Sequence, residues 1–577
     1  MSEQKEAYMF PTSKKEVDAL GWDYIDVILF TGDAFVDHPS FGSACIARWL
    51  QKWGWRVAVV PQPNWRDDLR DFKKLGTPRL YFAVNAGAMD SMVNHYTASK
   101  RLRHDDAYTP DGKFGQRPDR AVTVYASILK KLYPDVPVII GGVEASLRRL
   151  THYDYWNDCL MPSVLVSSGA DYLCYGMGEK PMLEFTRGIE AGRSLHDMHK
   201  IPQLAFFMTG KPRIRDGMFQ LHSYEECRKD KRAFAENFHY IEMYANMMHP
   251  DTLIECCGNG YVQVNPPYPP SSQEDMDSFW DLPFTKRPHP RYKGKRIPAY
   301  DMIKYSINTH RGCFGGCNFC TIAAHQGKFI QSRSESSILK EVKGLLDVPG
   351  FAGNISDLGA PTANMYGMHG KNPALCDVCR RKSCLFPAPC PNMDRSHERV
   401  LKMYHKVMSV KGIRHAYIGS GIRYDLFLNE DGFVDKTSYP YLKELILEHT
   451  SGRLKVAPEH TQDNVLYYMG KPSFNLFCRL RKEFDKITRE AGLNTGIVPY
   501  FISSHPGCRM SDMEKLADNP ALKGIYMDQV QDFTPTPMTT SSVMFYSGLD
   551  PRTMKPVFTE HDPEKKKMQK SFFFKKK

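Results

Sequence analysis

Long apolar runs are missing from this 577-residue sequence. No stretch reaches the roughly 18 apolar residues that a membrane-spanning helix needs, so we expect no membrane segment. The first residues, MSEQKEAYMFPTSKKEVD, also lack the apolar core of a secretory signal. We therefore expect a cytoplasmic protein, in which the 15 cysteines are thiols or metal ligands rather than disulfides.

Acidic residues are outnumbered by basic ones, 65 against 77, which gives a net charge of +12. Part of this excess is local, because the segment DPEKKKMQKSFFFKKK from Asp562 onward is rich in lysine. A charge run of this kind predicts a solvated or disordered tail. A basic surface suits RNA, DNA or an acidic protein as a partner, and charge alone does not decide among them.

The first half of the chain alternates strands and helices. Short apolar runs predict strands at residues 26–31, 56–60, 79–84 and 136–140. Ile46, Trp49 and Leu50 have the spacing of one helical face, and Gly54 follows as a helix end. The alternation predicts a doubly wound, Rossmann-like sheet with ligands beyond the carboxyl ends of its strands.

Two other stretches show little periodicity. Residues 90–120 are polar and basic, and we interpret them as a long surface loop that is either solvated or in contact with a partner such as RNA. Residues 261–298 are rich in proline, which removes backbone donors and fixes φ. We interpret this stretch as a linker or strap between domains.

Cys313, Cys317 and Cys320 form the pattern CxxxCxxC in one short segment that also holds three glycines. Three thiolates on one loop can face a common point, and soft sulfur ligands suit iron–sulfur clusters. Three ligands hold a [4Fe-4S] cube and leave one iron without a protein ligand. The alternative interpretation is three unrelated buried thiols, since cysteine packs well as a small apolar residue.

With Phe319 directly before the third cysteine, this pattern resembles the signature of radical S-adenosylmethionine (radical SAM) enzymes. The flanking words NTHRGC and CTIAAHQGK resemble the YgiQ family within that superfamily. The resemblance implies that the three cysteines hold a [4Fe-4S] cluster and that SAM binds the open iron. Reductive cleavage of SAM would then yield a 5′-deoxyadenosyl radical, with electrons from a donor such as a flavodoxin or ferredoxin. Phe319 would shield one face of the cluster.

The resemblance also implies a partial (β/α)6 TIM-like barrel after the linker. The sequence predicts a helix at residues 334–346, and strands at residues 304–307, 353–357, 415–419, 454–458, 495–502 and 524–530. Because functional residues of such barrels lie at strand ends, Asp357, Gly359 and Glu459 are candidates for contacts with SAM. Arg333 is a candidate for the SAM carboxylate, and a surface ion pair is the equal alternative.

Four domains and segments follow from these patterns. We predict a Rossmann-like, cobalamin-binding-like domain at residues 1–260, a proline-rich linker at 261–298, a radical SAM core at 299–550 with a cysteine-rich insertion at 371–392, and a basic tail at 551–577.

The first domain resembles cobalamin-binding-like domains in its glycines after predicted strands, Gly141 and Gly142 among them. The pattern DxHxxG of histidine-ligated cobalamin proteins is absent, because His38 directly follows Asp37 and stands four residues before Gly42. Bound cobalamin is therefore not expected. We interpret this domain as a ligand-free scaffold in which His38 caps or packs.

A second group of cysteines occupies the insertion, at Cys376, Cys379, Cys384 and Cys390. Four thiols in so short a segment suit a structural Zn²⁺ ion or a second iron–sulfur cluster. Their spacing matches neither a standard zinc motif nor a ferredoxin run, so redox-active or purely structural thiols remain the alternative. Cys508, after the strand predicted at 495–502, is either a hydrogen donor to a radical or an inert buried thiol.

These observations predict a radical SAM enzyme of unknown substrate, with modification of RNA or protein favoured over a small metabolite. Two alternatives stay open: a non-catalytic, metal-stabilised nucleic-acid-binding protein, and a cobalamin-dependent radical methyltransferase.

Overall fold

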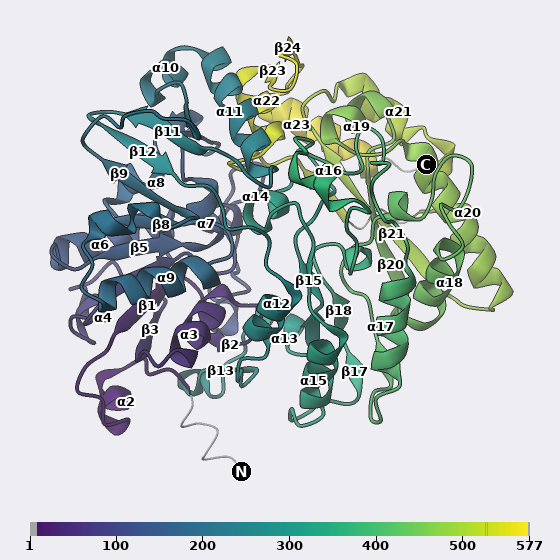
Figure 1. Ribbon diagram of the computed structural model, residues 1–577. Helices are drawn as coiled ribbons and strands as arrows, with labels where there is room; N and C mark the ends of the chain where they lie inside the picture. The colour runs from purple at the N-terminus through teal and green to yellow at the C-terminus, as the bar shows by residue number, and fades with distance from the viewer. Residues whose placement is uncertain (1–8, 526, 528, 575–577) are drawn as a thin grey trace. The chain divides into compact units, whose positions relative to one another are not determined.

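The computed structural model describes residues 9–525, 527 and 529–574, and the chain forms two compact units (Figure 1). The first unit contains the residues up to Ala233 together with His249–Pro269 and Ser278–Lys304. The second contains Phe234–Met248, Pro270–Asp277 and the chain from Tyr305 onward. The predicted domains divide the chain once at residue 260 and once at residue 298. In the structure, short segments between residues 233 and 305 belong alternately to the first and the second unit.

A nine-stranded sheet is the centre of the first unit, in the order β10-β11-β12-β9-β8-β5-β4-β1-β3. Its strands are β1 (Val27–Thr31), β3 (Val57–Pro61), β4 (Tyr81–Asn85), β5 (Val138–Gly141), β8 (Tyr172–Cys174), β9 (Leu204–Met208), β10 (Met218–Gln220), β11 (Thr252–Cys257) and β12 (Gly260–Val264). The adjacent strands β3, β1, β4, β5 and β8 run parallel. The predicted parallel α/β sheet is thus confirmed for these five strands, whereas β9 and β12 add antiparallel pairs.

Apolar side chains cover both faces of these parallel strands. Along a strand, successive side chains point to opposite faces. Leu29 of β1 belongs to a core that includes Phe185 of α9 (Glu179–Glu190), against which α3 (Gly42–Lys52) packs. Phe30, the next residue, stacks on Phe72, which contacts Tyr125 of α6 (Ala121–Leu132). Burial on both faces is what a doubly wound sheet requires.

The segment 90–120 is not the solvated loop that its composition predicts. It begins with α5 (Ser91–His95), capped by the side chain of Asp90. Arg117 is 1% exposed, donates to both carboxylate oxygens of Asp106 at 3.0 Å, and donates to the carbonyl oxygen of Ala86 at 2.8 Å. A buried ion pair therefore fixes this segment at the carboxyl end of β4, because a buried cation needs a paired anion.

The proline-rich stretch contributes regular elements. β12 lies inside the sheet, α12 (Gln273–Trp280) follows it, and β13 (Arg287–Pro288) pairs antiparallel with β2 (Val36–Asp37). Prolines sit between these elements or at the short edge strand β13, where a missing backbone donor costs little. The stretch is thus more ordered than the predicted linker.

Short parallel strands run through the second unit in chain order. They are β14 (Ser306–Asn308), β17 (Asn354–Ile355), β18 (Asp357–Gly359), β19 (His415–Ala416), β20 (Arg453–Glu459), β21 (Gly496–Ser503) and β22 (Gln529–Asp532). Parallel pairs join β14 to β18, β17 to β19, β20 to β21, and β21 to β22. A parallel bridge joins Ile422 to Val456 of β20. The strand predicted at 524–530 includes residues 526 and 528, which lie outside the described residues.

Helices separate these strands and supply the core of the second unit. They are α15 (Glu335–Leu345), α17 (Glu398–Met408), α18 (Ser438–Glu448), α20 (Phe474–Glu490) and α21 (Met510–Ala517). Ile338, Val342 and Leu345, which predict one helical face in the sequence, are fully buried in this core. Among the described residues, no helix is long and apolar enough to cross a membrane.

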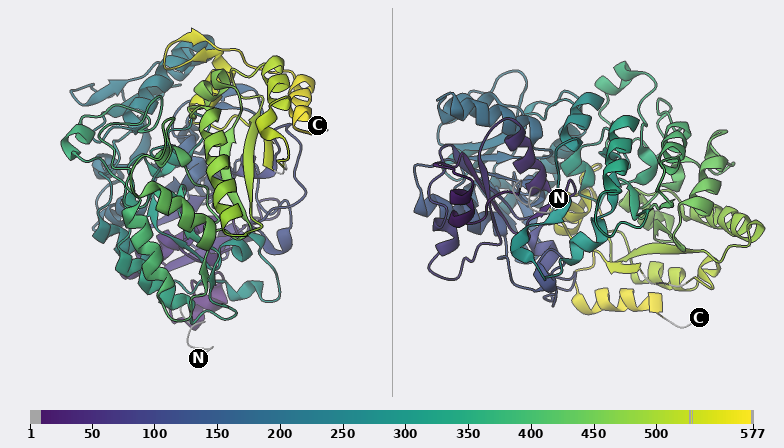
Figure 2. Two further views of the ribbon diagram at one scale, coloured as in Figure 1. Left: turned by 90° about the vertical axis from the view of Figure 1, so that its right-hand side faces the viewer. Right: turned by 90° about the horizontal axis from the view of Figure 1, so that it is seen from below.

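The lysine-rich end is not a solvated tail over its described residues. α23 (Pro563–Ser571) and a 3-10 turn at Phe572–Phe574 run beside the last strands of the second unit (Figure 2). Gln569 is 0% exposed, accepts a hydrogen bond from the backbone N–H of Ser504 at 3.0 Å, and donates to the carbonyl oxygen of Cys508 at 3.4 Å. Phe572 and Phe573 join the apolar core. The predicted disorder is wrong for residues 563–574; residues 575–577 lie outside the described residues.

We expect Gln569→Ala to destabilise the protein by about 1–3 kcal/mol, because it leaves a buried N–H and a buried carbonyl without their partner. Met568→Ala changes the same helix at a side chain that is 55% exposed, and we expect almost no effect. Thermal unfolding followed by circular dichroism compares the two variants. Equal melting temperatures would show that α23 does not stabilise the second unit.

Candidate functional site

The predicted cluster loop lies between β15 (His310–Arg311) and α14 (Ile322–Gln326) and contains Cys313, Cys317 and Cys320. Asn318 fixes its middle: the backbone N–H donates to the carbonyl oxygen of Met469 at 2.9 Å, and the side-chain amide donates to that of Tyr468 at 2.7 Å. The loop is therefore held from a segment about 150 residues further along the chain.

The three thiols are close enough to influence one another. Burial raises the pKa of Cys320 to about 12, and the charges of Cys317 and Cys313 act in the same direction. Burial also raises the pKa of Cys313, whose Sγ lies 3.5 Å from Oγ1 of Thr362. Thiolates in this position repel one another, so their ionised forms require a nearby positive charge such as a bound metal.

Arg423 supplies one positive charge. Its Nη1 donates to Sγ of Cys317 at 3.2 Å, and its Nε donates to Oδ1 of Asp425 at 2.9 Å. Burial disfavours the charged form of Arg423. The negative charges of Asp425 and Cys317 have the larger effect and raise the pKa of Arg423 well above its ordinary value. Burial alone would raise the pKa of Asp425, yet Arg423 holds it below the usual range. The pair stays ionised beside the loop.

Two glycines of the loop have no substitute that fits. Gly312 has a φ of +91°, and a Cβ there would lie 2.2 Å from the carbonyl oxygen of Phe329. Gly316 has a φ of +64°, and its Cβ would meet the side chain of Ser383 at 2.6 Å. Positive φ and close backbone approach both favour glycine. The tight path of the loop around the cysteines depends on these positions.

Phe319 lies edge-on to the ring of His505, with 6.0 Å between the ring centroids. His505 accepts a hydrogen bond from Ser541 at Nε2, 2.6 Å away, while Nδ1 donates to the carbonyl oxygen of Pro506. Burial lowers the pKa of His505 to about 3, so the ring is neutral at physiological pH. Aromatic and neutral groups thus adjoin the third cysteine.

Asp357 and Gly359 lie on β18, and both contact the residues that follow β19. Asp357 accepts hydrogen bonds from the backbone N–H groups of Gly419 and Ser420 at 2.8 and 3.0 Å. Burial raises its pKa despite these bonds. A Cβ at Gly359 would lie 2.4 Å from Oγ of Ser420. Both residues therefore join the ends of β18 and β19.

Glu459 ends β20 in a left-handed conformation, with a φ of +68°. It is 7% exposed, and its Oε1 lies 3.7 Å from Nζ of Lys471. Burial raises its pKa, while Lys471 and Arg423 act against the rise. The charge of Glu459 also acts on Cys320, which places this carboxylate within electrostatic range of the cluster loop. Strain of this kind in a residue other than glycine is frequent at functional sites.

Arg333 is placed differently from the prediction. It is fully buried, and its five donors bond to Ser337, to the carbonyl oxygen of Asn308 and to the carboxylate of Glu341. The guanidinium therefore anchors the start of α15 and has no N–H left for a SAM carboxylate. The alternative of a surface ion pair is also wrong, because the pair with Glu341 is internal.

Two further predicted residues have internal partners. Cys508 is fully buried, with Sγ 3.7 Å from Nε2 of His460 and 3.5 Å from Oε1 of Gln569. These contacts agree with an inert thiol. In the first unit, Nδ1 of His38 accepts a hydrogen bond from the backbone N–H of Ser40 at 3.1 Å, a local contact in the turn before α3.

Two of the four cysteines of the insertion, Cys384 and Cys390, lie next to the cluster loop. Cys384 donates its backbone N–H to the carbonyl oxygen of Phe314 at 3.0 Å, and Cys384 and Cys390 pack on the same apolar group as Cys313. Among the described residues, no group of three or more His, Cys, Asp or Glu side chains is arranged to hold a single metal ion.

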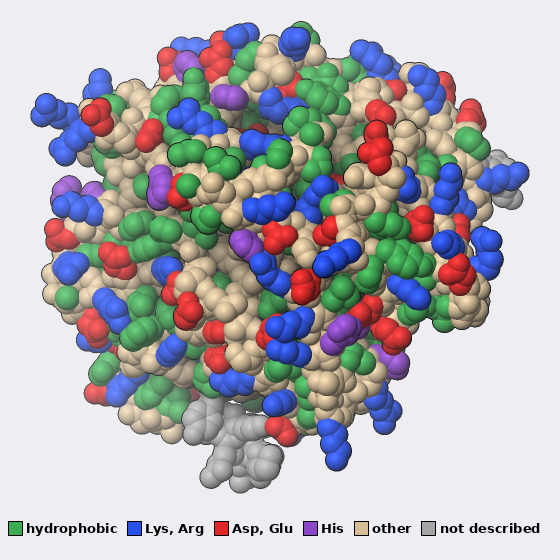
Figure 3. Space-filling view, turned by 45° about the vertical axis from the view of Figure 1, so that its right-hand side comes forward, with side chains coloured by type: hydrophobic (Ala, Val, Ile, Leu, Met, Phe, Trp, Pro, Cys, Tyr) green, Lys and Arg blue, Asp and Glu red, His purple; other side chains and the backbone are tan. Residues whose placement is uncertain are grey.

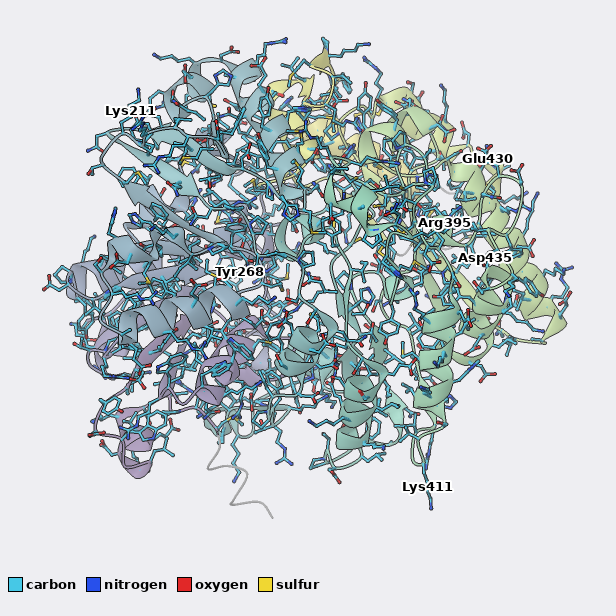
Figure 4. The ribbon with its side chains drawn as sticks, viewed as in Figure 1. Lys211, Tyr268, Arg395, Lys411, Glu430 and Asp435 are labelled. Carbon is cyan, nitrogen blue, oxygen red and sulfur yellow. The ribbon has the colours of Figure 1, made fainter. Side chains whose placement is uncertain are left out.

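The sequence reasoning missed the charged residues beside the loop. Arg423 and Asp425 follow β19 by several residues, beyond the strand-end position that the barrel pattern singles out. Arg395, between the insertion and α17, is half-buried (Figure 4). Burial lowers its pKa, while the negative charges of Asp425 and Asp435 act against the fall. The only available signal was the pairing of arginine and aspartate two residues apart. The basic excess gives no further clue on the face drawn in Figure 3, where Lys and Arg are interspersed with Asp and Glu.

Comparison with known proteins gives two family matches. A family model described as "Radical SAM N-terminal" matches residues 9–306, about half of the chain. A second, "Domain of unknown function (DUF3362)", matches residues 528–576. A UPF0313 protein of Bacteroides thetaiotaomicron is 54% identical over 100% of this chain and 95% of its own. The UPF0313 protein YgiQ of Escherichia coli K12 is 42% identical over 94% of this chain and 80% of its own.

Two solved structures are similar at low identity. The radical S-adenosylmethionine methyltransferase TsrM from Kitasatospora setae, with cobalamin and a [4Fe-4S] cluster bound, has 14% identity and a TM-score of 0.48 over 90% of this chain and 78% of its own. The cobalamin-dependent enzyme OxsB has 10% identity and a TM-score of 0.49 over 97% of this chain and 57% of its own. A similarity of this size transfers neither ligand nor activity. The expectation that cobalamin is not bound here stays a prediction.

The close relatives decide the family. They cover nearly the whole chain at identities far above chance, and they confirm the resemblance that the cluster loop carries. The chain belongs to the UPF0313 family, which includes YgiQ, and is a radical SAM protein of that family.

Proposed function

We propose that this protein is an enzyme that cleaves SAM reductively through a [4Fe-4S] cluster held by Cys313, Cys317 and Cys320. The observation that carries the proposal is three mutually coupled thiols on one rigid loop, in a family described by its radical SAM domain. When bound, the cluster supplies an electron to SAM at its open iron and so yields a 5′-deoxyadenosyl radical.

The donor set fits such a cluster. Three soft sulfurs come from a loop whose glycines allow the tight path, and one of them accepts a hydrogen bond from Arg423. Hydrogen bonds and positive charges at cluster sulfurs are the usual means by which proteins adjust reduction potential. A cube differs from a single ion in that each thiolate binds a different iron, so the thiolates need not converge at one point.

We further propose that the parallel strands of the second unit form a partial (β/α)6 barrel. The pairs β14–β18, β17–β19, β20–β21 and β21–β22, with the bridge between Ile422 and Val456, support an unbroken order. The cluster loop follows β14, Arg423 follows β19 and Glu459 ends β20. Residues at the carboxyl ends of different strands are expected to share one site in a barrel.

The chain's own residues would position SAM and exclude water. Glu459, held in a strained conformation beside Lys471, and the backbone around Gly359 remain the proposed contacts. Asp357 would act indirectly, by holding β19 to β18 through Gly419 and Ser420. Phe319 and the neutral ring of His505 would keep water from the third cysteine. A dry, preorganised site protects a reactive carbon radical from side reactions.

Substrate class, partners and location follow from charge and composition. We propose modification of RNA or protein, because a net charge of +12 suits an acidic partner. We also propose a cytoplasmic location and a flavodoxin or ferredoxin as the electron donor. Cobalamin would add methyl transfer to the chemistry, which leaves S-adenosylhomocysteine beside the 5′-deoxyadenosine from the radical step. Corrinoid absorbance in purified protein therefore distinguishes the two reactions. Zinc without labile sulfide would favour a non-catalytic, nucleic-acid-binding role.

We expect the variant with Cys313, Cys317 and Cys320 all changed to alanine to lose reductive SAM cleavage. Without the three thiolates the proposed [4Fe-4S] cluster, here called the first cluster, has no protein ligands. Anaerobic reconstitution with iron and sulfide, followed by chromatography of 5′-deoxyadenosine, measures the reaction. Cys478→Ala, a half-buried thiol on α20, is the matched control and should retain it. Release of 5′-deoxyadenosine by the triple variant would refute the proposed function.

We expect Arg423→Met to lower the free energy of unfolding by about 3–5 kcal/mol, because it leaves Asp425 as an unpaired buried charge. Adding Asp425→Asn should restore much of this stability. In that double variant, the reduction potential of the first cluster should become more negative, since a positive charge beside Cys317 favours the added electron.

Spectroelectrochemistry of reconstituted protein measures this shift. Arg453→Met, at the opposite end of β20 from Glu459, is the control and should leave the potential unchanged. An unchanged potential in the folded double variant would show that Arg423 does not act on the cluster.

A further inference from the structure

The cysteine-rich insertion has little to hold it together. Its one regular element is the single-turn helix α16 (Pro373–Asp377), and Leu375 and Val378 are 56% and 76% exposed. Its few buried apolar groups belong to a small cluster shared with the cluster loop. A segment this short, with so few buried side chains, usually needs a covalent or metal crosslink to keep one conformation.

A polar side chain of the insertion contacts one of its sulfurs. The Asn392 side-chain amide donates to Sγ of Cys376 at 3.4 Å and to the carbonyl oxygen of Asn372 at 2.9 Å. A Cβ at Gly370 would lie only 2.3 Å from Sγ of Cys376, so only glycine at this position leaves room for the sulfur. Amide donors to cysteine sulfur are typical of metal-bound thiolates. The base of the insertion is therefore built around Cys376.

Lys328 points into the same group of sulfurs. It is 2% exposed, and its Nζ lies 3.8 Å from Sγ of Cys379 and 2.7 Å from the carbonyl oxygen of Arg381. Within the described part of the chain, Nζ of Lys328 forms no ion pair with a carboxylate. An ammonium group is costly to bury unless negative charge accompanies it. Thiolates of the insertion are the groups placed to supply that charge.

The insertion also contacts the backbone of the cluster loop between its first two cysteines. Oγ of Ser383 donates to the carbonyl oxygen of Gly315 at 2.8 Å, and the N–H of Cys384 donates to that of Phe314 at 3.0 Å. Ser383 fills the space beside Gly316. A fixed conformation of the insertion therefore also fixes the backbone of the loop that carries Cys313 and Cys317.

We infer that Cys376, Cys379, Cys384 and Cys390 bind a second, thiolate-ligated metal centre, charge-balanced by Lys328, which keeps the cluster loop in its conformation. Four thiolates suit either one zinc ion or one iron–sulfur cluster. Because the described side chains do not converge at the spacing of one ion, zinc binding requires the thiols to turn about χ1. A cluster lets each sulfur bind a different iron. This centre does not depend on SAM cleavage.

The test uses the full chain with Cys313, Cys317 and Cys320 changed to alanine, which removes the first cluster. Protein purified without oxygen is analysed for iron, acid-labile sulfide and zinc. We expect about one zinc per chain, or about four irons with sulfide, in this triple variant. Either result supports the centre and identifies its metal. A folded triple variant without metal, before and after reconstitution with iron and sulfide or with zinc, would overturn the inference.

Two further measurements locate the metal. Adding Cys379→Ala and Cys384→Ala to the triple variant should abolish metal binding, whereas adding Cys478→Ala should not. If the variant with five changes fails to fold, alkylation of the triple variant decides instead. Cysteines of residues 371–392 should be protected from iodoacetamide until a chelator is added, as mass spectrometry of that peptide reports. Equal labelling before and after chelation would place the metal elsewhere and refute the assignment.

Discussion

Three half-buried thiols on one loop are the constraint around which the second unit is arranged. Sulfur that must bind iron has to be ionised, yet burial raises the pKa of Cys313 and Cys320, and each thiolate disfavours the next. The protein meets this conflict with fixed positive charge. Arg423 reaches Cys317 with one donor and uses the others on Asp425, which keeps the guanidinium ionised and oriented. A bound cluster would supply the remaining positive charge.

The same loop owes its position to distant segments. Asn318 bonds to the end of α19 (Asp463–Met469), Ser383 of the insertion bonds to Gly315, and Cys313 donates its backbone N–H to the carbonyl oxygen of Gly327. Each contact closes a loop of the chain at an entropic cost that only the folded unit offsets. The cluster loop is thus rigid because three separate segments hold it, which is what positioning of a reactive ligand requires.

In the first unit, internal polar contacts lie at the carboxyl ends of the strands, where a doubly wound sheet usually binds its ligand. Asn85 accepts hydrogen bonds from Thr31 and from Ser43, at 2.9 and 3.2 Å. Burial raises the pKa of Asp33 to about 6 even though Arg117 opposes the rise. Internal contacts therefore occupy part of this edge. The corrinoid assay decides whether this edge also admits a cofactor.

Local pattern alone was enough for the family and for most secondary structure. The spacing of Cys313, Cys317 and Cys320 lies within one loop, and the periodicity of Ile338, Val342 and Leu345 lies within one helix, so neither depends on the rest of the fold. Strands of the parallel sheet were predictable for the same reason, because their continuous apolar runs record burial on both faces.

Tertiary structure decided every contact between residues far apart in the chain. Arg423 meets Cys317 across 106 positions, and no local spacing indicates that partner. Arg333, which its position suggests for SAM, turns instead to Ser337 and Glu341, because a buried guanidinium takes the nearest set of acceptors. The lysine-rich end forms α23 and docks through Gln569, since a few buried groups outweigh many solvated lysines. Composition counts charges along the chain, whereas burial and pairing depend on where the fold places them.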